Sequence, residues 1–556
     1  MVDHAAAPPR RRLLRVVVAL LVVALTGAGV VAARSGLATR AAGYLPWASP
    51  PGPCPATEVH VVAAPEAVTT VSEIIRPLEG RALPDGSCLR PEVRAESPAR
   101  TVDGGAVLAS TPPQVWVPDS SLWLGQVQGW PLRPVGSLGT SPVILAGSSS
   151  TLQRLGWRQR TPSWVQALSP ERRLVAPTMT DDAPSLLGLL ALARSVGPGP
   201  RAEQAVAALV LAGLRTPAPD VAAAAVLARS GKREAPVLLT SRQAVVQLNL
   251  DPTTEKLSTV RPSGTPAVLD YPVLRVGRPT DDPVVGAGAD LVAGALTSAD
   301  GVRTAQAAGF GPPVPVVAPA TPQGKAAAAQ VASFVARVRL LAQPSRMLIL
   351  LDTSLSMSQE VKPGISRIRL AVQAALGTGG LLPDTSAIGL WRFAGQQTTR
   401  QPYREVARVL DLGAVDGAVS HRDVVNAALT DAPKRLSPGG TALYDTTLAA
   451  WRKVRSSYDA KATNAVVVFT DGANEYADGI DLKEFRRKVA ADAKAHPREP
   501  IVLVCIGMGP AADMRALQAM VAPVGGRAYR ADTPQELRTV LFDSIAHRTP
   551  RAGAGS

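Results

Sequence analysis

Oxygen-bearing side chains stand directly after two apolar runs in the C-terminal half of the sequence. Asp352, Ser354 and Ser356 follow the run 347–351, and Asp471 follows the run 465–469. Thr441 comes after a pair of glycines between these two runs. Two carboxylates and three hydroxyls are hard ligands, with too little charge for a dedicated calcium cage. This ligand set predicts a site for Mg²⁺ or Mn²⁺.

The segments around these residues alternate between strand and helix patterns. Short apolar runs, typical of strands buried on both faces, occupy residues 347–351, 388–394, 465–469, 501–506 and 528–529. Between them, apolar residues recur three and four positions apart, as on one face of a helix. A final helix is expected from Thr533, with Glu536 in a capping box. The alternation predicts a doubly wound α/β domain over residues 346–548, in which ligands bind at the carboxyl ends of the strands.

The five oxygen-bearing residues resemble the metal-ion-dependent adhesion site of the von Willebrand factor type A domain. Residues 352–356 match the Asp-x-Ser-x-Ser loop of that family, Thr441 its threonine, and Asp471 its later aspartate. The resemblance implies that all five side chains hold the cation, directly or through water. It also implies an open coordination position for a carboxylate from a partner protein. The alternative is a surface loop whose hydroxyls only cap the helix that follows.

The composition describes a folded chain with a strongly basic balance. The 556 residues are enough for two or three domains, with 46% hydrophobic and 19% charged residues. The net charge is +15 and the isoelectric point is about 10.2. Arginine is spread along the whole chain without an aromatic-interleaved basic stripe, so we do not expect nucleic-acid binding. A diffuse basic surface suits anionic lipid head groups or acidic wall polymers.

The first 34 residues indicate a cytoplasmic basic stub and a signal anchor that spans the membrane. Arginines at positions 10–12 and 15 precede an uncharged apolar stretch, residues 16–33, at the lower length limit of a transmembrane helix. We therefore expect a single-pass protein of the cell membrane with most of its chain outside the cytoplasm. Cleavage after residues 31–33 is the alternative and would release a secreted protein. Residues 35–53 are expected to be a linker.

Three cysteines fit an exported chain. Cys54 and Cys88 bracket the first expected strand and helix of the next domain, and we expect them to form a disulfide. Cys505 lies within an apolar run and is expected to be an inert buried thiol.

Residues 54–318 predict a second α/β unit. It resembles the bacterial extracellular solute-binding proteins of the type II periplasmic-binding fold, in which two lobes close on a ligand. The resemblance is carried by residues 115–124, 141–146, 176–190 and 270–272. It implies a ligand site formed by Asp119, Ser120, Ser121, Ser141 and Thr178. The helix after Thr178 is expected to present its N-terminus to an anion or carboxylate. The alternative is that all five are ordinary turn and cap residues.

The remaining segments connect or extend these two domains. Residues 319–345 are expected to form a Pro- and Ala-rich linker with a helix at 325–341, whose apolar stripe docks on one of the domains. Residues 549–556 are expected to be a flexible tail.

No pattern in the sequence indicates catalysis. The five histidines stand in unrelated contexts, and neither a phosphate-binding loop nor a His-Glu-x-x-His zinc helix occurs. The serines beside Asp352 have no general base. We therefore expect a protein that is not an enzyme.

These features together favour a membrane-anchored, extracytoplasmic binding protein. Its magnesium site would bind an acidic residue of a partner protein, and its solute-binding-like domain would sense a small solute. One alternative is the solute receptor of a transport system, with the metal domain as a docking module for a permease. Another is an assembly factor that helps enzymes insert metals, which the N-terminal membrane segment disfavours.

Overall fold

The computed structural model of the chain describes residues 54–533 apart from several short segments. The segments left out are 104–111, 128–129, 170–172, 215–216, 233–234, 278–281, 318–321, 381, 396, 399–400, 473 and 511. The expected anchor and linker at 1–53, the final helix after Thr533 and the tail at 549–556 therefore lie outside the described residues. Within the described part, no helix combines the length and the apolar character needed to cross a membrane.

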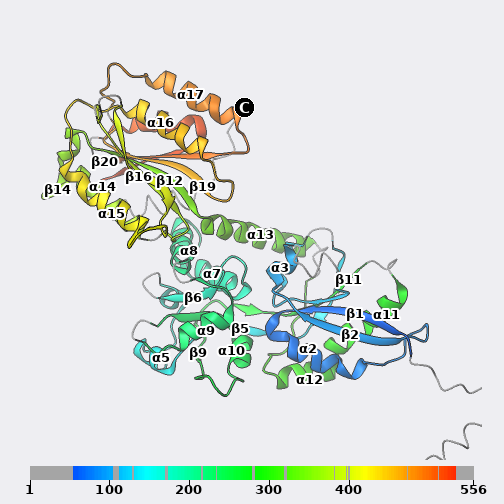
Figure 1. Cartoon of the computed structure of the whole chain (residues 1–556). Coiled ribbons are helices and arrows are strands. Elements are labelled where there is room, and N and C mark those ends of the chain that lie inside the picture. The colour runs from blue at the N-terminus through cyan, green and yellow to red at the C-terminus, as the bar shows by residue number, and fades with distance from the viewer. Residues whose placement is uncertain are drawn as a thin grey trace, which may run out of the picture.

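The N-terminal region is built as two α/β lobes (Figure 1). The first lobe contains the strands β1 (Ala56–Ala63), β2 (Cys88–Ala95), β3 (Val115–Val117), β4 (Leu132–Ser137) and β11 (Pro272–Val276). Their order is β2-β1-β3-β11-β4, with β11 antiparallel to both of its neighbours. The helices of this lobe are α2 (Val68–Ile75), α3 (Pro98–Val102), α11 (Pro283–Thr297) and α12 (Ala299–Ala307).

The second lobe has a sheet of six strands, and the chain enters it after β4. The strands are β5 (Ser141–Gly147), β6 (Leu174–Pro177), β7 (Pro217–Ala218), β8 (Val237–Ser241), β9 (Ser258–Val260) and β10 (Val268–Leu269). They follow the path β10-β5-β8-β6-β7, and β9 also pairs with β5. The helices are α5 (Ser149–Arg154), α6 (Trp164–Ala167), α7 (Ala183–Val196), α8 (Pro200–Gly213), α9 (Val221–Arg229) and α10 (Arg242–Leu248). The chain returns to the first lobe between β10 and β11.

A disulfide joins Cys54 and Cys88 at the start of the first lobe. The register of β1 and β2 places Cys88 opposite Ala56, two residues after Cys54 in the chain. The third cysteine, Cys505, is fully buried, and burial raises the pKa of its thiol to about 12. This thiol is therefore protonated and inert at neutral pH.

Replacing Cys88 with serine is expected to destabilise the first lobe by about 3 kcal/mol, because the cross-link then no longer restricts the unfolded chain between two cysteines that are 34 positions apart. Urea unfolding followed by circular dichroism measures the change. Dithiothreitol serves as the control, since it should lower the midpoint of the wild type and leave that of the variant unchanged. Equal midpoints for oxidised wild type and variant would contradict this expectation.

Helix α13 (Pro322–Ala342) follows α12 of the first lobe in the sequence, packs against the second lobe and leads into the C-terminal domain (Figure 1). Phe334, Val338 and Leu341 are buried on its apolar side, and the helix contacts α8. Two ion pairs, Arg337 with Glu203 and Arg339 with Asp181, join the same helix to the second lobe. The apolar stripe therefore docks on the chain itself.

The C-terminal domain is organised around one six-stranded sheet. Its strands are β12 (Ser345–Asp352), β15 (Ala387–Phe393), β16 (Tyr403–Asp411), β19 (Thr463–Thr470), β20 (Ile501–Met508) and β21 (Arg527–Ala531). The order is β16-β15-β12-β19-β20-β21. All neighbouring pairs are parallel except β15 and β16, which are antiparallel.

Helices cover both faces of this sheet. They are α14 (Arg367–Gly379) and α15 (His421–Asp431) on one face, and α16 (Leu443–Ser456), α17 (Leu482–Ala495) and α18 (Met514–Val521) on the other. Alternate residues of β12 pack into the hydrophobic cores on the two faces of the sheet. Ile349 and Leu351 face α14, and Leu348 and Leu350 face α16. Each fully buried aliphatic side chain stabilises the fold by roughly 1.5–3 kcal/mol. The mixed α/β architecture that the sequence predicts is confirmed.

One strand of this sheet is absent from the sequence prediction. Strand β16 carries the exposed charged residues Arg404, Glu405 and Arg408, so its sequence is too polar for the apolar-run criterion. It forms the edge of the sheet, where one side of the strand meets solvent and charged residues are tolerated.

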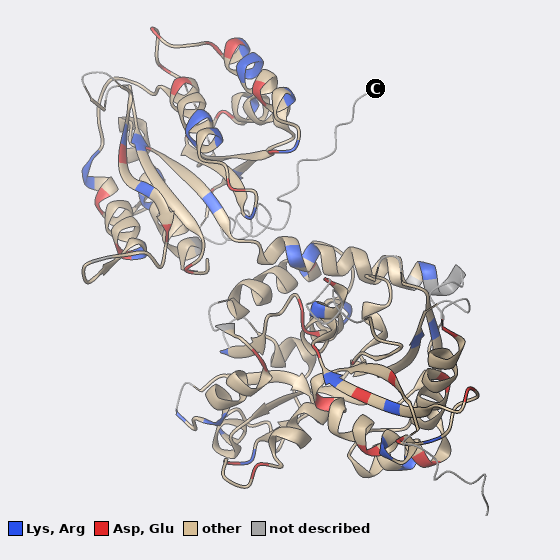
Figure 2. Cartoon of the chain, turned by 45° about the vertical axis from the view of Figure 1, so that its right-hand side comes forward, with Lys and Arg blue, Asp and Glu red and all other residues tan. Residues whose placement is uncertain are grey.

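Charged residues are distributed over the whole described chain. Figure 2 shows Lys and Arg on helices and strands of both the N-terminal region and the C-terminal domain, interspersed with Asp and Glu. The distribution fits the diffuse basic charge expected from the sequence.

Candidate metal centre

Asp352 is the last residue of β12, and its carboxylate is fully buried. The backbone N–H of Ser354 donates to Oδ1 at 2.9 Å, and the hydroxyl of Thr470, at the end of β19, donates to Oδ2 at 2.7 Å. β12 and β19 are parallel neighbours, so their carboxyl ends meet at one edge of the sheet. The strand therefore delivers a carboxylate, held by two neutral donors, to that edge.

The two serines of the loop lie together on the same edge. The hydroxyl oxygens of Ser354 and Ser356 are 2.9 Å apart. Ser354 occupies the N-cap position of the short 3-10 helix η5 (Leu355–Ser358), yet its side chain makes no cap hydrogen bond. Helix α14 begins only at Arg367. The hydroxyls therefore do not cap a helix. This disfavours the alternative of a surface loop whose hydroxyls only cap the helix that follows.

Asp471 follows β19 and has one satisfied and one unsatisfied carboxylate oxygen. Arg367 donates through Nη1 to Oδ2 at 2.9 Å, and the side chains of both residues are at least nine-tenths buried. Oδ1 is buried and has no hydrogen-bond partner. Arg367 also donates to the backbone oxygen of Ser356 at 3.3 Å. A buried carboxylate oxygen without a partner costs free energy, which a bound cation would recover.

Thr441 is brought to the same edge by a loop that is hydrogen-bonded on three sides. Ser437 N–H donates to the Thr353 oxygen at 2.8 Å, Gly395 N–H to the Gly440 oxygen at 2.6 Å, and Glu475 N–H to the Thr441 oxygen at 2.9 Å. Thr441 is buried as a result. Gly440 has φ 78°, and a Cβ there would collide with the backbone of Glu475.

The electrostatics of the site favour an added positive charge. Burial and, to a smaller extent, the nearby Asp471 raise the pKa of Asp352 to about 7, against the opposing effect of hydrogen bonds from Ser354 and Thr470. The donor set of two carboxylates and three hydroxyls is that of a small hard cation such as Mg²⁺ or Mn²⁺. A divalent cation fits these residues, because it would stabilise both carboxylates and satisfy Asp471 Oδ1.

Arg367 is a site residue that no sequence motif indicates. It stands at the start of α14, whose first turn borders the loop of Asp352. Its guanidinium is the positive charge in direct contact with Asp471. It therefore neutralises part of the charge that a divalent cation would neutralise.

A second group of side chains could also hold a metal ion, but its glutamates are less buried than the residues around Asp352. The ligand atoms of Glu58, His60 and Glu92, on β1 and β2, lie within 4.8 Å of one another. Both glutamates are about half exposed, and Glu92 also accepts hydrogen bonds from Arg94. Glu92 is already paired with Arg94 and both glutamates meet solvent, so the edge around Asp352 is the better candidate.

The predicted solute residues of the N-terminal region take local roles. Asp119 is buried and accepts from Trp123 Nε1 at 2.7 Å, and Ser120 caps the short 3-10 helix η4 (Ser121–Trp123). The N–H of Ser121 donates to the carboxylate of Asp270. Ser141 accepts from the N–H of Gln243 on α10, and Thr178 is exposed after β6. Helix α7 starts at Ala183 with Asp182 as its N-cap, four residues beyond Thr178. Among the five predicted residues, the cap and turn alternative accounts for Ser120.

Four acids gather between the two lobes, and only Asp119 among them is a solute residue predicted from the sequence. Glu66 accepts from the hydroxyl of Tyr271 at 2.8 Å, and Asp119, Asp182 and Asp270 lie close enough to influence Glu66 or one another. Burial raises the pKa of all four carboxyls, that of Asp182 to about 7. Each comes from a different connecting segment, so no local pattern brings them together.

This group predicts a dependence of stability on pH. In the folded chain Asp182 holds its proton up to about pH 7, against an ordinary pKa of 3.8, so the proton stabilises the fold. That stabilisation is complete below about pH 4 and is lost as the pH rises through about 7. Asp182→Asn has no proton to lose and keeps the cap acceptor for Ser185 N–H. Between about pH 5 and pH 8 we expect the wild type to lose roughly 2–4 kcal/mol relative to the variant. Thermal unfolding at both pH values measures the difference, and parallel pH profiles would contradict it.

Comparison with known proteins yields likeness in structure alone. No protein-family model matches the chain, and no curated protein has a similar sequence. A solved von Willebrand factor type A structure from Catenulispora acidiphila has 19% identity and a TM-score of 0.28, over 37% of this chain and 43% of its own. The chain thus spans less than half of that protein. A periplasmic thiamin binding protein has 13% identity and a TM-score of 0.37, over 52% of this chain and 99% of its own. Iron-bound HitA from Pseudomonas aeruginosa has 13% identity and a TM-score of 0.36, over 51% of this chain and 99% of its own.

Proposed function

We propose that the C-terminal domain is a magnesium-dependent module that binds an acidic residue of a partner protein. The observation that carries the proposal is the buried, unpartnered Oδ1 of Asp471 beside the buried carboxylate of Asp352. Two acids at the end of neighbouring strands are costly without a cation, and the three hydroxyls around them are ligands for the same ion.

Each residue has a distinct role in this proposal. Asp352 and Asp471 supply the charge, and Ser354, Ser356 and Thr441 supply neutral oxygens, either directly or through water. The bound cation supplies an open coordination position for a carboxylate. Thr470 holds Asp352 in place through its hydrogen bond, and the loop at 437–441 fixes Thr441. Arg367 orients Asp471 and limits the net negative charge of the site.

The proposal places the protein outside the cytoplasm on a membrane anchor formed by residues 16–33. The disulfide between Cys54 and Cys88 supports this placement, because disulfides persist in oxidising compartments. The same disulfide disfavours a cytoplasmic assembly factor. We propose binding rather than catalysis as the activity.

The N-terminal region is proposed to sense a small solute between its two lobes. The acids gathered there, Glu66, Asp119, Asp182 and Asp270, favour a cationic solute over the anion that the sequence suggested, since a bound cation would stabilise the ionised form that burial disfavours. A transport receptor with the C-terminal domain as its docking module is the second candidate, favoured by the two-lobed architecture.

Capture of partners by the full chain tests the first candidate. The tagged wild-type protein is incubated with solubilised membrane and envelope proteins in Mg²⁺ or in EDTA, beside Asp352→Ala. A partner retained only by wild type in Mg²⁺ supports the proposal. Retention of the same partners in EDTA would contradict it, and retention of a permease in either condition would favour the transport candidate.

A further inference from the structure

The edge strand of the C-terminal sheet has one side without a described partner. β16 pairs with β15 on one side, and no described strand pairs with the other. Its nine residues therefore present a row of backbone donors and acceptors along that side. An unpaired edge of this length is a template for another extended chain.

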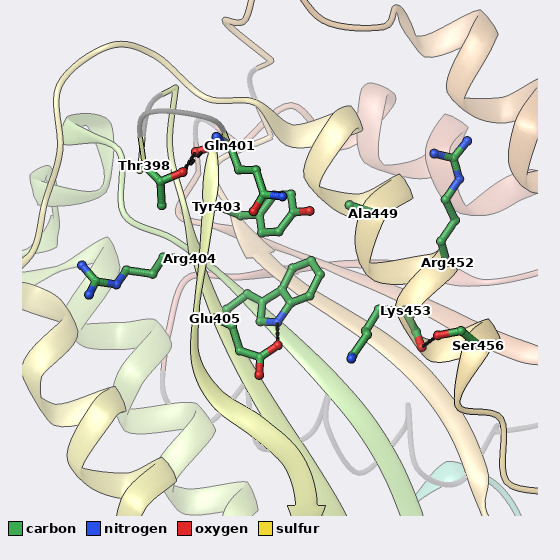
Figure 3. A pocket seen from close by; sticks show the side chains of 10 residues that line it. Thr398, Gln401, Tyr403, Arg404, Glu405, Ala449, Arg452, Lys453 and Ser456 are labelled. Atoms are coloured by element: carbon green, nitrogen blue, oxygen red, sulfur yellow. Dashed lines mark hydrogen bonds between the residues drawn. The ribbon is translucent and has the colours of Figure 1, made fainter.

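A polar groove of about 510 Å³ lies between this strand and α16. Figure 3 shows Tyr403 and Glu405 on the strand side, and Ala449, Lys453 and Ser456 on the helix side. Trp391 stacks in parallel on Tyr403, with ring centroids 4.4 Å apart, and donates to Glu405. Lys453 and the neighbouring Arg452 are exposed and form no ion pair with a described residue. The groove therefore has a rigid wall and two basic groups available for an acid.

An apolar groove lies along the same strand on the side of α15, with a volume of about 450 Å³. Its lining includes Leu410 of β16 and the hairpin of β17 (Val415–Asp416) and β18 (Val419–Ser420). Val415 is 72% exposed, Val419 48% and Leu410 44%. Such a concentration of exposed aliphatic side chains on β16 and the adjoining hairpin marks an interaction surface. Glu405 borders both grooves, so the two surfaces are continuous across the strand.

We propose that β16 binds an extended segment of a partner protein whose side chains alternate between acidic and apolar. A chain that adds to the edge as a strand sends successive side chains to opposite faces of the sheet. Its acidic side chains then reach Lys453 and Arg452, and its apolar side chains cover Val415 and Val419. A single segment fills both grooves only if it runs along the strand.

Charge identifies the occupant as a partner rather than a second copy of this chain. Arg404 and Arg408 are exposed on β16, and Figure 3 shows Arg404 extending to the side away from Lys453. Two copies paired edge to edge would line one seam with these arginines from both copies, which is unfavourable. A partner segment instead places its acidic side chains on the face of the sheet that carries Arg452 and Lys453. The proposal is independent of the metal site, because none of its contacts uses Asp352 or its neighbours.

The test uses a fluorescein-labelled peptide, acetyl-Glu-Val-Glu-Val-Glu-Val-Glu-amide, and the full chain in EDTA. Fluorescence anisotropy is expected to show saturable binding to the wild type and to Asp352→Ala alike. The double variant Arg452→Glu/Lys453→Glu and the variant Val419→Asp are each expected to bind at least about tenfold more weakly. Lys483→Glu/Arg486→Glu on α17 makes the same charge change outside both grooves and is expected to bind like the wild type. Circular dichroism checks that each exposed substitution leaves the fold intact.

Two N-methylated peptides distinguish strand addition from side-chain binding. One carries N-methyl groups on the valines and the other on the glutamates, and these groups point to opposite edges of an extended chain. Strand addition predicts that one of the two loses binding and the other retains it. Absence of binding by the parent peptide, or loss with both or neither methylated form, would overturn the proposal. Displacement of the peptide by a sulfated polysaccharide with both methylated forms still bound would assign the surface to a saccharide instead.

Discussion

Replacing Asp352 with alanine is expected to weaken Mg²⁺ binding by at least about 100-fold, or ~2.7 kcal/mol. Asp352 is fully buried and contributes one of the two carboxylates of the site. Its loss removes a full negative charge where the surroundings screen charge poorly, so the attraction for a divalent cation falls steeply. Isothermal titration calorimetry of the full chain with MgCl₂ measures the dissociation constant.

Two further variants make this result interpretable. Asp384→Ala removes an exposed carboxylate of the same domain, 73% exposed in its side chain, and is expected to bind Mg²⁺ like the wild type. Asp352→Asn preserves the volume of the side chain and the acceptor for Ser354 N–H but not the charge. It is expected to lose binding while unfolding at a temperature close to that of the wild type. Wild-type affinity in either Asp352 variant would show that the cation binds elsewhere.

Replacing Arg367 with methionine is expected to strengthen Mg²⁺ binding about tenfold, or ~1.4 kcal/mol. The guanidinium contacts Asp471 within the buried site and repels any cation placed beside it. Methionine keeps much of the apolar stem of arginine and removes the charge. Asp471 then offers both oxygens to the metal, and the net charge of the site becomes more negative.

The same titration with Arg367→Lys distinguishes repulsion of the cation by Arg367 from the positioning of Asp471 by Arg367. Lysine keeps the charge but not the planar fork that contacts both Asp471 and Ser356, so it is expected to bind Mg²⁺ no more tightly than the wild type. Weaker binding by Arg367→Met than by the wild type would contradict the competing role and would make Arg367 purely a positioning residue for Asp471.

The convergence of the loops around Asp352 was accessible from sequence for a simple reason. β12 and β19 are buried on both faces and therefore read as unbroken apolar runs, and the first polar residue after each run marks its carboxyl end. Parallel strands place those ends at one edge. Thr441 follows from its two glycines, Gly439 and Gly440, both of which have the positive φ that such a loop requires.

Other parts of the site depend on contacts between distant segments and leave no local pattern. Arg367 lies 104 positions before Asp471, and an arginine at the start of a helix looks like any exposed cation. The acids between the lobes likewise come from four separate connections. Strand β16 was not predicted because an edge strand has polar residues where a central strand has apolar ones. Hydrophobic periodicity detects buried apolar residues, whereas these features are defined by long-range polar contacts or by an exposed position at the edge of the sheet.

The measurement that tests the central claim most directly is the anomalous diffraction of manganese in crystals of the full chain soaked in MnCl₂. We expect one strong peak at the carboxyl edge of β12 and β19. Side-chain oxygens of Asp352, Ser354 or Ser356 should lie about 2 Å from this peak, with Asp471 and Thr441 around it. A peak only at Glu58, His60 and Glu92, or no peak at all, would contradict the account.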